Sequence, residues 1–267
     1  MSLVPYHDVF LCTNRKLKEV KNLVLLHGWG LHSGLWDSVM PELLEQFNVT
    51  VIDLPGMGRS PLPSGNYDLR SICEQVLQVA PNNAVWLGWS LGGLVALKIA
   101  ADHPDRVTGL VNIGSTPKFC KGDDWPEGMA GHLLDRFSGL VAEDWRGALI
   151  RFLALQCKDS DSYGEDVSKL KELMLFHGQP AQQALRQGLI ILRDADLRSE
   201  LQSLTVPSLY LFGENDNVVS RNMVISVEAL NEKCCVVVVR GAGHIPSLSH
   251  PESFLRALGD FISERLA

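Results

Sequence analysis

The sequence lacks the features that mark several large classes of protein. No uninterrupted apolar run in its 267 residues approaches the length of a membrane span. The first sixteen residues lack the basic-then-apolar layout of a signal peptide, so we expect a cytoplasmic protein that binds no membrane. The formal net charge is -7, which argues against nucleic acid as the main partner, because phosphate binding needs a basic surface.

Paired cysteines and metal-ligand clusters are also missing. The 6 cysteines form no CxxC motif and no regular pairs, so we interpret them as reduced, structural thiols. No group of His, Cys, Asp and Glu has the spacing of metal ligands, so we expect no metal. What is present is 46% hydrophobic and 21% charged residues, which is typical of a globular protein with a substantial core.

Short apolar runs alternate with helix-like patterns through most of the chain. We interpret the runs 4–13 (an edge strand), 22–26, 48–54, 84–87, 106–113, 208–212 and 234–239 as strands, and expect helices over about 35–46, 69–79, 91–103, 222–230 and 251–266. The central strands lack the polar–apolar alternation of a sheet with one face in water. This pattern predicts an α/β fold with a mostly parallel central sheet and helices on both faces.

One long segment interrupts this alternation. From about residue 118 to residue 200 the periodicity is helical, and no convincing strand occurs. We interpret it as a helical cap inserted into a single domain whose core is 1–117 and 201–267. A cap of this kind should lie over the carboxyl ends of the strands, where open α/β sheets place their ligands.

The motif G-x-S-x-G stands between an apolar run and a helix-like pattern. Ser90 lies between Gly88 and Gly92, with the run 84–87 before it and the pattern 91–103 after it. A nucleophile that must stand clear of a sheet needs this sharp strand–turn–helix, and its neighbours must be small. The motif alone is weak, because a turn serine before a helix gives the same letters.

Two further residues make the serine a candidate nucleophile. Asp216 and His244 each follow a predicted strand, and the order Ser, Asp, His at strand ends is that of the α/β-hydrolases. Serine attack needs a base and a carboxylate that orients the base. Glu214 and Asp194 are alternatives for the acid. The remaining polar candidates have plainer interpretations: His27 would bond its own loop, His250 would start a helix, and Asp53 would brace the loop 55–60.

The oxyanion of a tetrahedral intermediate requires two N–H groups that already point at it. One should be the backbone amide of Leu91, the residue after the nucleophile. The other should come from the Gly-rich turn 27–30, and we assign it to the amide of Trp29. We expect the Trp29 side chain to form part of the pocket wall.

Several motifs together resemble one family. HGWGL, DLPGMGRS, GWSLGGLVA, DHPDRV, DWP, RFLALQ and GAGHIPSLSHPE are similar to the pimeloyl-acyl-carrier-protein methyl ester esterases of biotin synthesis, over most of the chain. The resemblance implies hydrolysis of the methyl ester of carrier-bound pimelate, without a cofactor. It implies Ser90, Asp216 and His244 as the triad, Trp29 and Leu91 as oxyanion donors, and Trp89 and Phe152 as further residues lining the acyl channel.

The cap departs from the family pattern in its charge. Arg151 matches the arginine of RFLALQ and is our candidate for docking the acidic acyl carrier protein, but acidic and basic residues are mixed through the rest of the cap. We expect a monomer. The alternatives are a C–C-bond hydrolase of ring-cleavage products, a broad short-chain carboxylesterase, and a non-catalytic binding protein of the same fold. The last of these should have lost a triad member, and none is missing.

Overall fold

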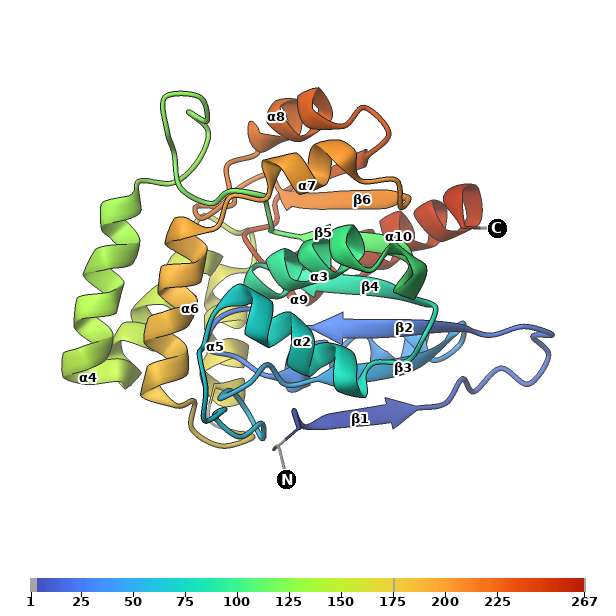
Figure 1. Ribbon diagram of the computed structural model, residues 1–267, viewed down its shortest axis with the longest axis horizontal. Helices are drawn as coiled ribbons and strands as arrows, with labels where there is room; N and C mark the ends of the chain where they lie inside the picture. Colours follow the sequence, from blue (N-terminus) through green and yellow to red (C-terminus); the bar gives the residue numbers. More distant parts are fainter. Residues whose placement is uncertain (1–3, 175, 267) are drawn as a thin grey trace.

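A seven-stranded sheet runs through the molecule, and its strands are ordered β1-β3-β2-β4-β5-β6-β7. The computed structural model describes residues 4–174 and 176–266 (Figure 1). The strands are β1 (His7–Phe10), β2 (Lys21–Leu26), β3 (Phe47–Ile52), β4 (Ala84–Trp89), β5 (Val107–Ile113), β6 (Ser208–Gly213) and β7 (Cys235–Val239). Strands β2 to β7 pair in parallel, and only β1 pairs antiparallel, with β3. The predicted mostly parallel sheet is confirmed.

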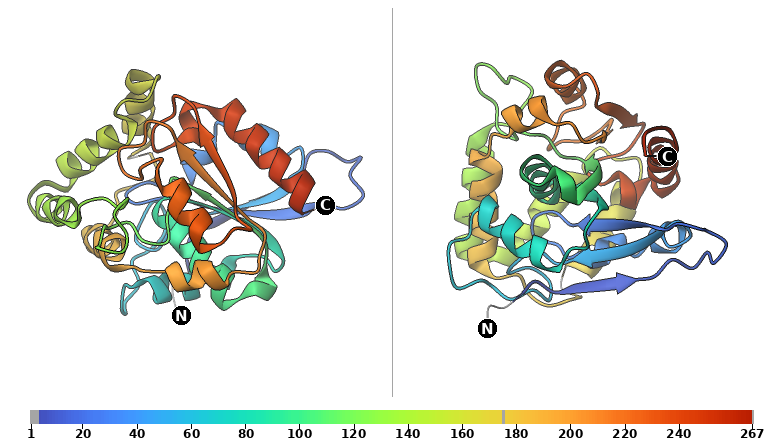
Figure 2. Two further views of the ribbon diagram at one scale, coloured as in Figure 1. Left: turned by 90° about the horizontal axis from the view of Figure 1, so that it is seen from above. Right: turned by 45° about the vertical axis from the view of Figure 1, so that its right-hand side comes forward.

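Helices cover both faces of the sheet. They are α1 (Met40–Leu43), α2 (Leu69–Val79), α3 (Leu91–Asp102), α4 (Gly131–Cys157), α5 (Tyr163–Leu173), α6 (Gln182–Asp194), α7 (Arg198–Ser203), α8 (Met223–Leu230), α9 (Pro246–Ser249) and α10 (Pro251–Arg265), with 3-10 helices η1 (Ser33–Trp36) and η2 (Pro104–Arg106). Figure 2 shows α2 and α3 on one face and α10 on the other. Every residue of β4 is buried, as expected for a strand covered on both sides.

The helices α4, α5 and α6, which we call the cap helices, lie beyond the carboxyl ends of the parallel strands (Figure 1). Helix α4 is two helices joined at Asp144, whose backbone has the non-helical angles φ -146 and ψ 85. The Asp144 carboxylate accepts a hydrogen bond from the amide of Gly147 at 3.0 Å, as an N-cap does. The second half of α4 therefore begins afresh at this aspartate and carries Arg151 and Phe152.

The single helix expected over 35–46 is wrong. The chain forms η1 and then the separate short helix α1, with Pro41 in its first turn. A continuous helix would need an N–H from Pro41, and the proline ring would clash with the carbonyl of Asp37. In the part of the chain that the structure describes, no helix is long and apolar enough to cross a membrane.

Candidate active site

Ser90 occupies the sharp turn between β4 and α3, with φ 55 and ψ -116. L-residues rarely adopt a positive φ, so this backbone is strained. Two neighbouring groups fix it: the Ser90 amide donates to the carbonyl of Ile113 at 3.0 Å, and the Ser115 hydroxyl donates to the Ser90 carbonyl at 2.9 Å. The turn is thus held from the adjacent strand β5 and the loop that follows it.

The two motif glycines allow backbone segments to approach each other closely. A Cβ at Gly88 would lie 2.3 Å from the carbonyl oxygen of Gly92. A Cβ at Gly92 would lie 2.5 Å from the carbonyl oxygens of Leu26 and His27. Strand β4, helix α3 and the end of β2 therefore meet around Ser90 with no room for side chains on either glycine.

Asp216 and His244 form a buried pair beside this turn. The Nδ1 atom of His244 lies 2.7 Å from Oδ2 of Asp216, and neither side chain is exposed. The other carboxylate oxygen accepts the amides of Val218 and Val219 at 2.7 and 2.9 Å. Because Asp216 binds the Nδ1 side of the ring, Nε2 is left as the proton acceptor.

The Nε2 atom of His244 is buried and has no hydrogen-bond partner among the described residues. The ring is held in place by its own backbone, since the His244 amide donates to the Gln156 carbonyl at 2.9 Å and the His244 carbonyl accepts the Trp89 indole N–H at 3.0 Å. Within residues 4–174 and 176–266, the structure shows no hydrogen bond between His244 and Ser90. Such bonds are often long without substrate and tighten only when it is bound.

The alternative acids are engaged elsewhere. Glu214 accepts the amide of Gly241 at 3.0 Å and pairs with Arg221 at 3.4 Å, so it braces the turn after β6. Asp194 forms a two-pronged pair with its neighbour Arg193 at 2.7 and 2.9 Å. Of the three carboxylates, Asp216 is the one that contacts His244.

The amides predicted to form the oxyanion hole lie next to Ser90. Leu91 is the first residue of α3, so its N–H has no partner within the helix. The Trp29 amide donates no hydrogen bond among the residues that the structure describes. The turn before it passes close to the nucleophile, because a Cβ on Gly28 would lie 3.0 Å from Cβ of Ser90. Neither amide thus donates a hydrogen bond within the part of the chain that the structure describes.

The expected pocket-lining aromatic residues are all buried. Trp29 donates its indole N–H to the carbonyl of Leu185 in α6 at 2.7 Å and packs edge-on against Phe152 of α4, with ring centroids 4.9 Å apart. Trp89 lies against the His244 ring, at a centroid distance of 5.7 Å. These contacts join the turn that carries Trp29 to α4 and α6, and bring Trp89 against the catalytic pair.

Arg151 lies apart from these residues, on the surface of α4. Its side chain is exposed and forms no ion pair within the described ranges. The Arg193 side chain, by contrast, pairs with Asp135 at 2.7 Å, so part of the cap charge is already neutralised locally.

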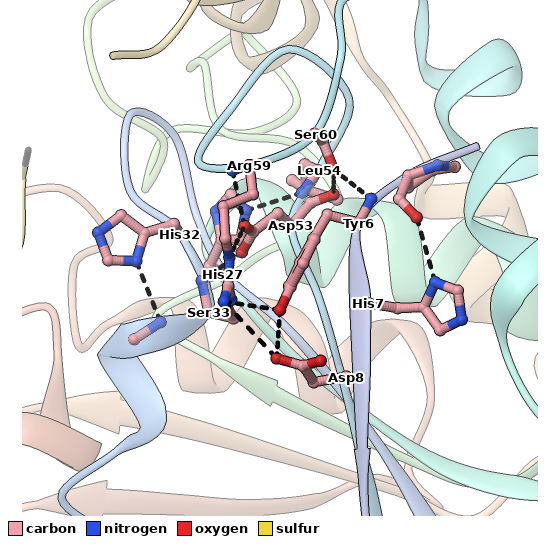
Figure 3. Close-up of polar contacts among 12 residues, drawn as sticks. Tyr6, His7, Asp8, His27, His32, Ser33, Asp53, Leu54, Arg59 and Ser60 are labelled. Carbon is pink, nitrogen blue, oxygen red and sulfur yellow. Dashed lines mark hydrogen bonds and ion pairs between the residues drawn. The ribbon is translucent and has the colours of Figure 1, made fainter. Parts of the chain in front are cut away.

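One polar cluster, centred on Asp53, was not predicted in full (Figure 3). Fully buried Asp53 accepts the amide of Ser33 at 2.7 Å and the amide and Nε of Arg59 at 2.9 and 3.2 Å. Arg59 also donates to the Ser33 hydroxyl at 2.8 Å and to Tyr6 at 2.7 Å. Asp53 therefore braces the turn 27–36 as well as the expected loop 55–60.

The pKa of Asp53 is lowered from its ordinary value. Burial, the largest single influence, raises it, but the interaction with His27 and the hydrogen bonds from Arg59 and Ser33 outweigh burial. The sequence signal for this cluster was an aspartate at a strand end followed by an arginine in a turn. Gln156 received no role from the sequence, although it ends the RFLALQ motif, and both polar atoms of its buried amide lack a partner among the described residues.

Comparisons with known proteins place the chain in a family. Residues 21–251 match the alpha/beta hydrolase fold family. A pimeloyl-acyl-carrier-protein methyl ester esterase of Edwardsiella ictaluri is 41% identical over 92% of this chain and 94% of its own length. One of the same name from Yersinia enterocolitica is 42% identical over 91% of this chain and 93% of its own.

Solved structures show the same fold. An esterase from Exiguobacterium antarcticum superposes with a TM-score of 0.85 at 24% identity, covering 97% of this chain and 96% of that one. A bromoperoxidase from Bacillus anthracis superposes with a TM-score of 0.84 at 21% identity, covering 99% of both chains. On the strength of the sequence matches, the chain belongs to the alpha/beta hydrolase fold family and, within it, to the family of pimeloyl-acyl-carrier-protein methyl ester esterases.

Proposed function

We propose that this protein is a serine carboxylesterase that hydrolyses the methyl ester of pimeloyl-acyl-carrier protein, releasing methanol and the carboxylate. The observation that carries the chemistry is the buried Asp216–His244 pair, whose Nε2 has no hydrogen-bond partner in the described part of the chain, beside the strained turn of Ser90. The substrate is inferred from the relatives at 41% and 42% identity whose names state it. The reaction as proposed uses no cofactor.

Each residue has a defined step in this proposal. Ser90 Oγ attacks the ester carbonyl while His244 Nε2 takes its proton, and Asp216 stabilises the resulting imidazolium. The oxyanion binds the amides of Trp29 and Leu91, each worth about 10²–10³ in rate. The imidazolium of His244 then gives its proton to the departing methoxide oxygen, which leaves as methanol. Water attacks the acyl-enzyme by the same route and releases the acid.

The cap supplies the binding surface in this proposal. Residues 118–200 form a cap inserted into one α/β-hydrolase domain, with 1–117 and 201–267 as its core. Trp29, Trp89 and Phe152 line the channel for the apolar pimeloyl chain. Arg151 has no local carboxylate partner in the described residues, which supports a role in docking the acidic carrier. The protein acts as a monomer that binds the carrier transiently.

The decisive experiment is hydrolysis of pimeloyl-acyl-carrier-protein methyl ester by the purified protein. Mass spectrometry of the carrier should show loss of one methyl group, and Ser90→Ala should abolish that loss while retaining the fold. The protein should also rescue a biotin-requiring strain that lacks its own methyl ester esterase. Rapid turnover of dienoic ring-cleavage products, with no turnover of the carrier-bound ester, would refute the proposal in favour of a C–C-bond hydrolase.

A further inference from the structure

His27 has a defined protonation state. The amide of Leu54 donates to its Nε2 atom at 2.8 Å, so in the neutral ring the proton must be on Nδ1. That Nδ1–H donates to the carbonyl of Gly28 at 2.8 Å. The side chain is fully buried, and burial lowers the pKa of His27 to about 4, so the ring is neutral at neutral pH. Both ring nitrogens thus form hydrogen bonds to backbone groups.

The carbonyl that His27 binds belongs to the peptide that carries the Trp29 amide. The structure contains no cis peptide bond in its described ranges, so the Gly28 C=O and the Trp29 N–H point in opposite directions across one plane. Because His27 holds the Gly28 carbonyl toward itself, the Trp29 N–H of the same peptide must point away from His27. The only other donor to this carbonyl among the described residues is the Leu31 amide, at the long distance of 3.5 Å.

This peptide lies beside the nucleophile. A Cβ on Gly28 would approach Cβ of Ser90 to 3.0 Å and the Trp89 ring to 2.6 Å, so the backbone has no room to shift toward Ser90. On the other side, the Leu54 amide holds the imidazole against movement away from the turn. The Gly28–Trp29 peptide is therefore confined between the sharp turn at Ser90 and the His27 ring.

We propose that His27 is a positioning residue of the oxyanion hole, which aims the Trp29 N–H at the developing oxyanion through the Gly28–Trp29 peptide. The inference rests on the proposed esterase function. His27 is fully buried and acts through this peptide. Its hydrogen bond also polarises the peptide, which strengthens the N–H as a donor. A histidine that merely ties down a loop would affect stability, whereas one that aims a donor affects turnover.

Two variants separate these roles, because each keeps one of the two hydrogen bonds. In His27→Asn the amide nitrogen takes the place of Nδ1 and can donate to Gly28, but nothing accepts the Leu54 amide. In His27→Gln the longer side chain reaches Leu54, and the Gly28 carbonyl keeps only the long hydrogen bond from the Leu31 amide. Both variants should lose stability, so activity is measured at a temperature at which circular dichroism shows both to be folded.

We expect the kcat of His27→Gln for a p-nitrophenyl ester to fall about ten- to a hundredfold with KM nearly unchanged, because a donor misplaced by about 1 Å costs that much. His27→Asn should stay within about threefold of the parent, on the same reasoning that its donor is retained. The affinity of an alkyl boronic acid, whose tetrahedral adduct places an oxygen in the oxyanion hole, should weaken in His27→Gln by the same factor as kcat/KM. Equal losses in both variants, or no loss in either, would overturn the proposal.

A measurement on the parent protein makes the test independent of folding in the variants. Nitrogen-15 NMR should show the His27 proton on Nδ1 at neutral pH, and boronate binding should move the Trp29 amide proton downfield. An unmoved Trp29 amide would also overturn the inference. Failure of the proposed function looks different, because the parent and Ser90→Ala would then hydrolyse the ester equally poorly.

Discussion

Replacing Ser90 by alanine and by glycine should separate the chemistry of this residue from the strain in its backbone. Both variants lack the hydroxyl, so both should lose nearly all hydrolysis of p-nitrophenyl esters. They differ in backbone freedom, because only glycine adopts the observed φ of 55 and ψ of -116 without a penalty. The comparison between the two inactive variants therefore measures the strain.

The expected size follows from three contributions. Relief of the strained conformation favours glycine by about 1–3 kcal/mol. Loss of a buried methyl group costs about 0.8 kcal/mol, and the added freedom of the unfolded chain costs about 0.4–1 kcal/mol. Ser90→Gly should therefore be as stable as Ser90→Ala or slightly more stable. At buried Ala96 inside α3 there is no strain to relieve, so Ala96→Gly should cost about 2 kcal/mol.

These differences in the free energy of unfolding can be measured by urea unfolding, with the fluorescence of the 6 tryptophans as the signal. The alanine-to-glycine step at position 90 and the step at Ala96 should differ by about 2 kcal/mol in the free energy of unfolding. If glycine at position 90 destabilised the Ser90→Ala protein as much as Ala96→Gly destabilises the parent, the turn would store no strain and this reasoning would fail. Residual hydrolysis within tenfold of the parent would refute the role of Ser90 as nucleophile.

Three further predictions concern the catalytic acid Asp216, the buried His27 and the cap residue Arg151. Asp216→Asn should lower kcat about 10⁴-fold, because the amide holds the wrong tautomer of the catalytic histidine. Glu214→Gln should keep a kcat near that of the parent, and the reverse result would assign the catalytic acid to Glu214. Since the pKa of His27 is about 4 when folded and about 6.5 when unfolded, only the unfolded chain gains this proton as the pH falls from about 6.5 to about 4. The free energy of unfolding should therefore drop over that window by up to about 3 kcal/mol more in the parent than in His27→Gln, and parallel urea midpoints for the two proteins would contradict the assignment. Arg151→Glu should raise KM for the carrier-bound ester up to about fivefold, and this effect should shrink in high salt. Arg256→Glu, the same charge change at an exposed position of α10, should leave KM unchanged, and equal effects of both would exclude docking at Arg151.

The local pattern was enough to predict most of the sheet and the turn at Ser90. Buried parallel strands are short apolar runs, and the glycines around Ser90 are required by contacts within the turn and with β2, the neighbouring strand in the sheet. The order of Ser90, Asp216 and His244 along the chain then placed three side chains at strand ends. Parallel strands bring these ends to one edge of the sheet, so sequence order alone carried spatial information.

Features that depend on partners far away in the chain could not be predicted. The Asp53 cluster joins Tyr6, Ser33 and Arg59, whose contacts exist only after β1, β3 and the turn 27–36 have packed. The helix over 35–46 was predicted from its apolar spacing, and the position of Pro41 should have divided it. The tautomer of His27 depends on a backbone amide supplied by the adjoining strand end, which no sequence pattern reveals.

The turn that carries Trp29 is attached to all three cap helices. Trp29 is bonded to α6 through Leu185, a Cβ on Gly30 would lie 2.3 Å from a methyl group of Leu149 in α4, and His32 bonds the carbonyl of Leu173 in α5 at 2.6 Å. The cap is therefore not an exchangeable module. A cap grafted from a relative would lack the matching contacts for this turn, and turnover would fall even for esters too small to touch the cap.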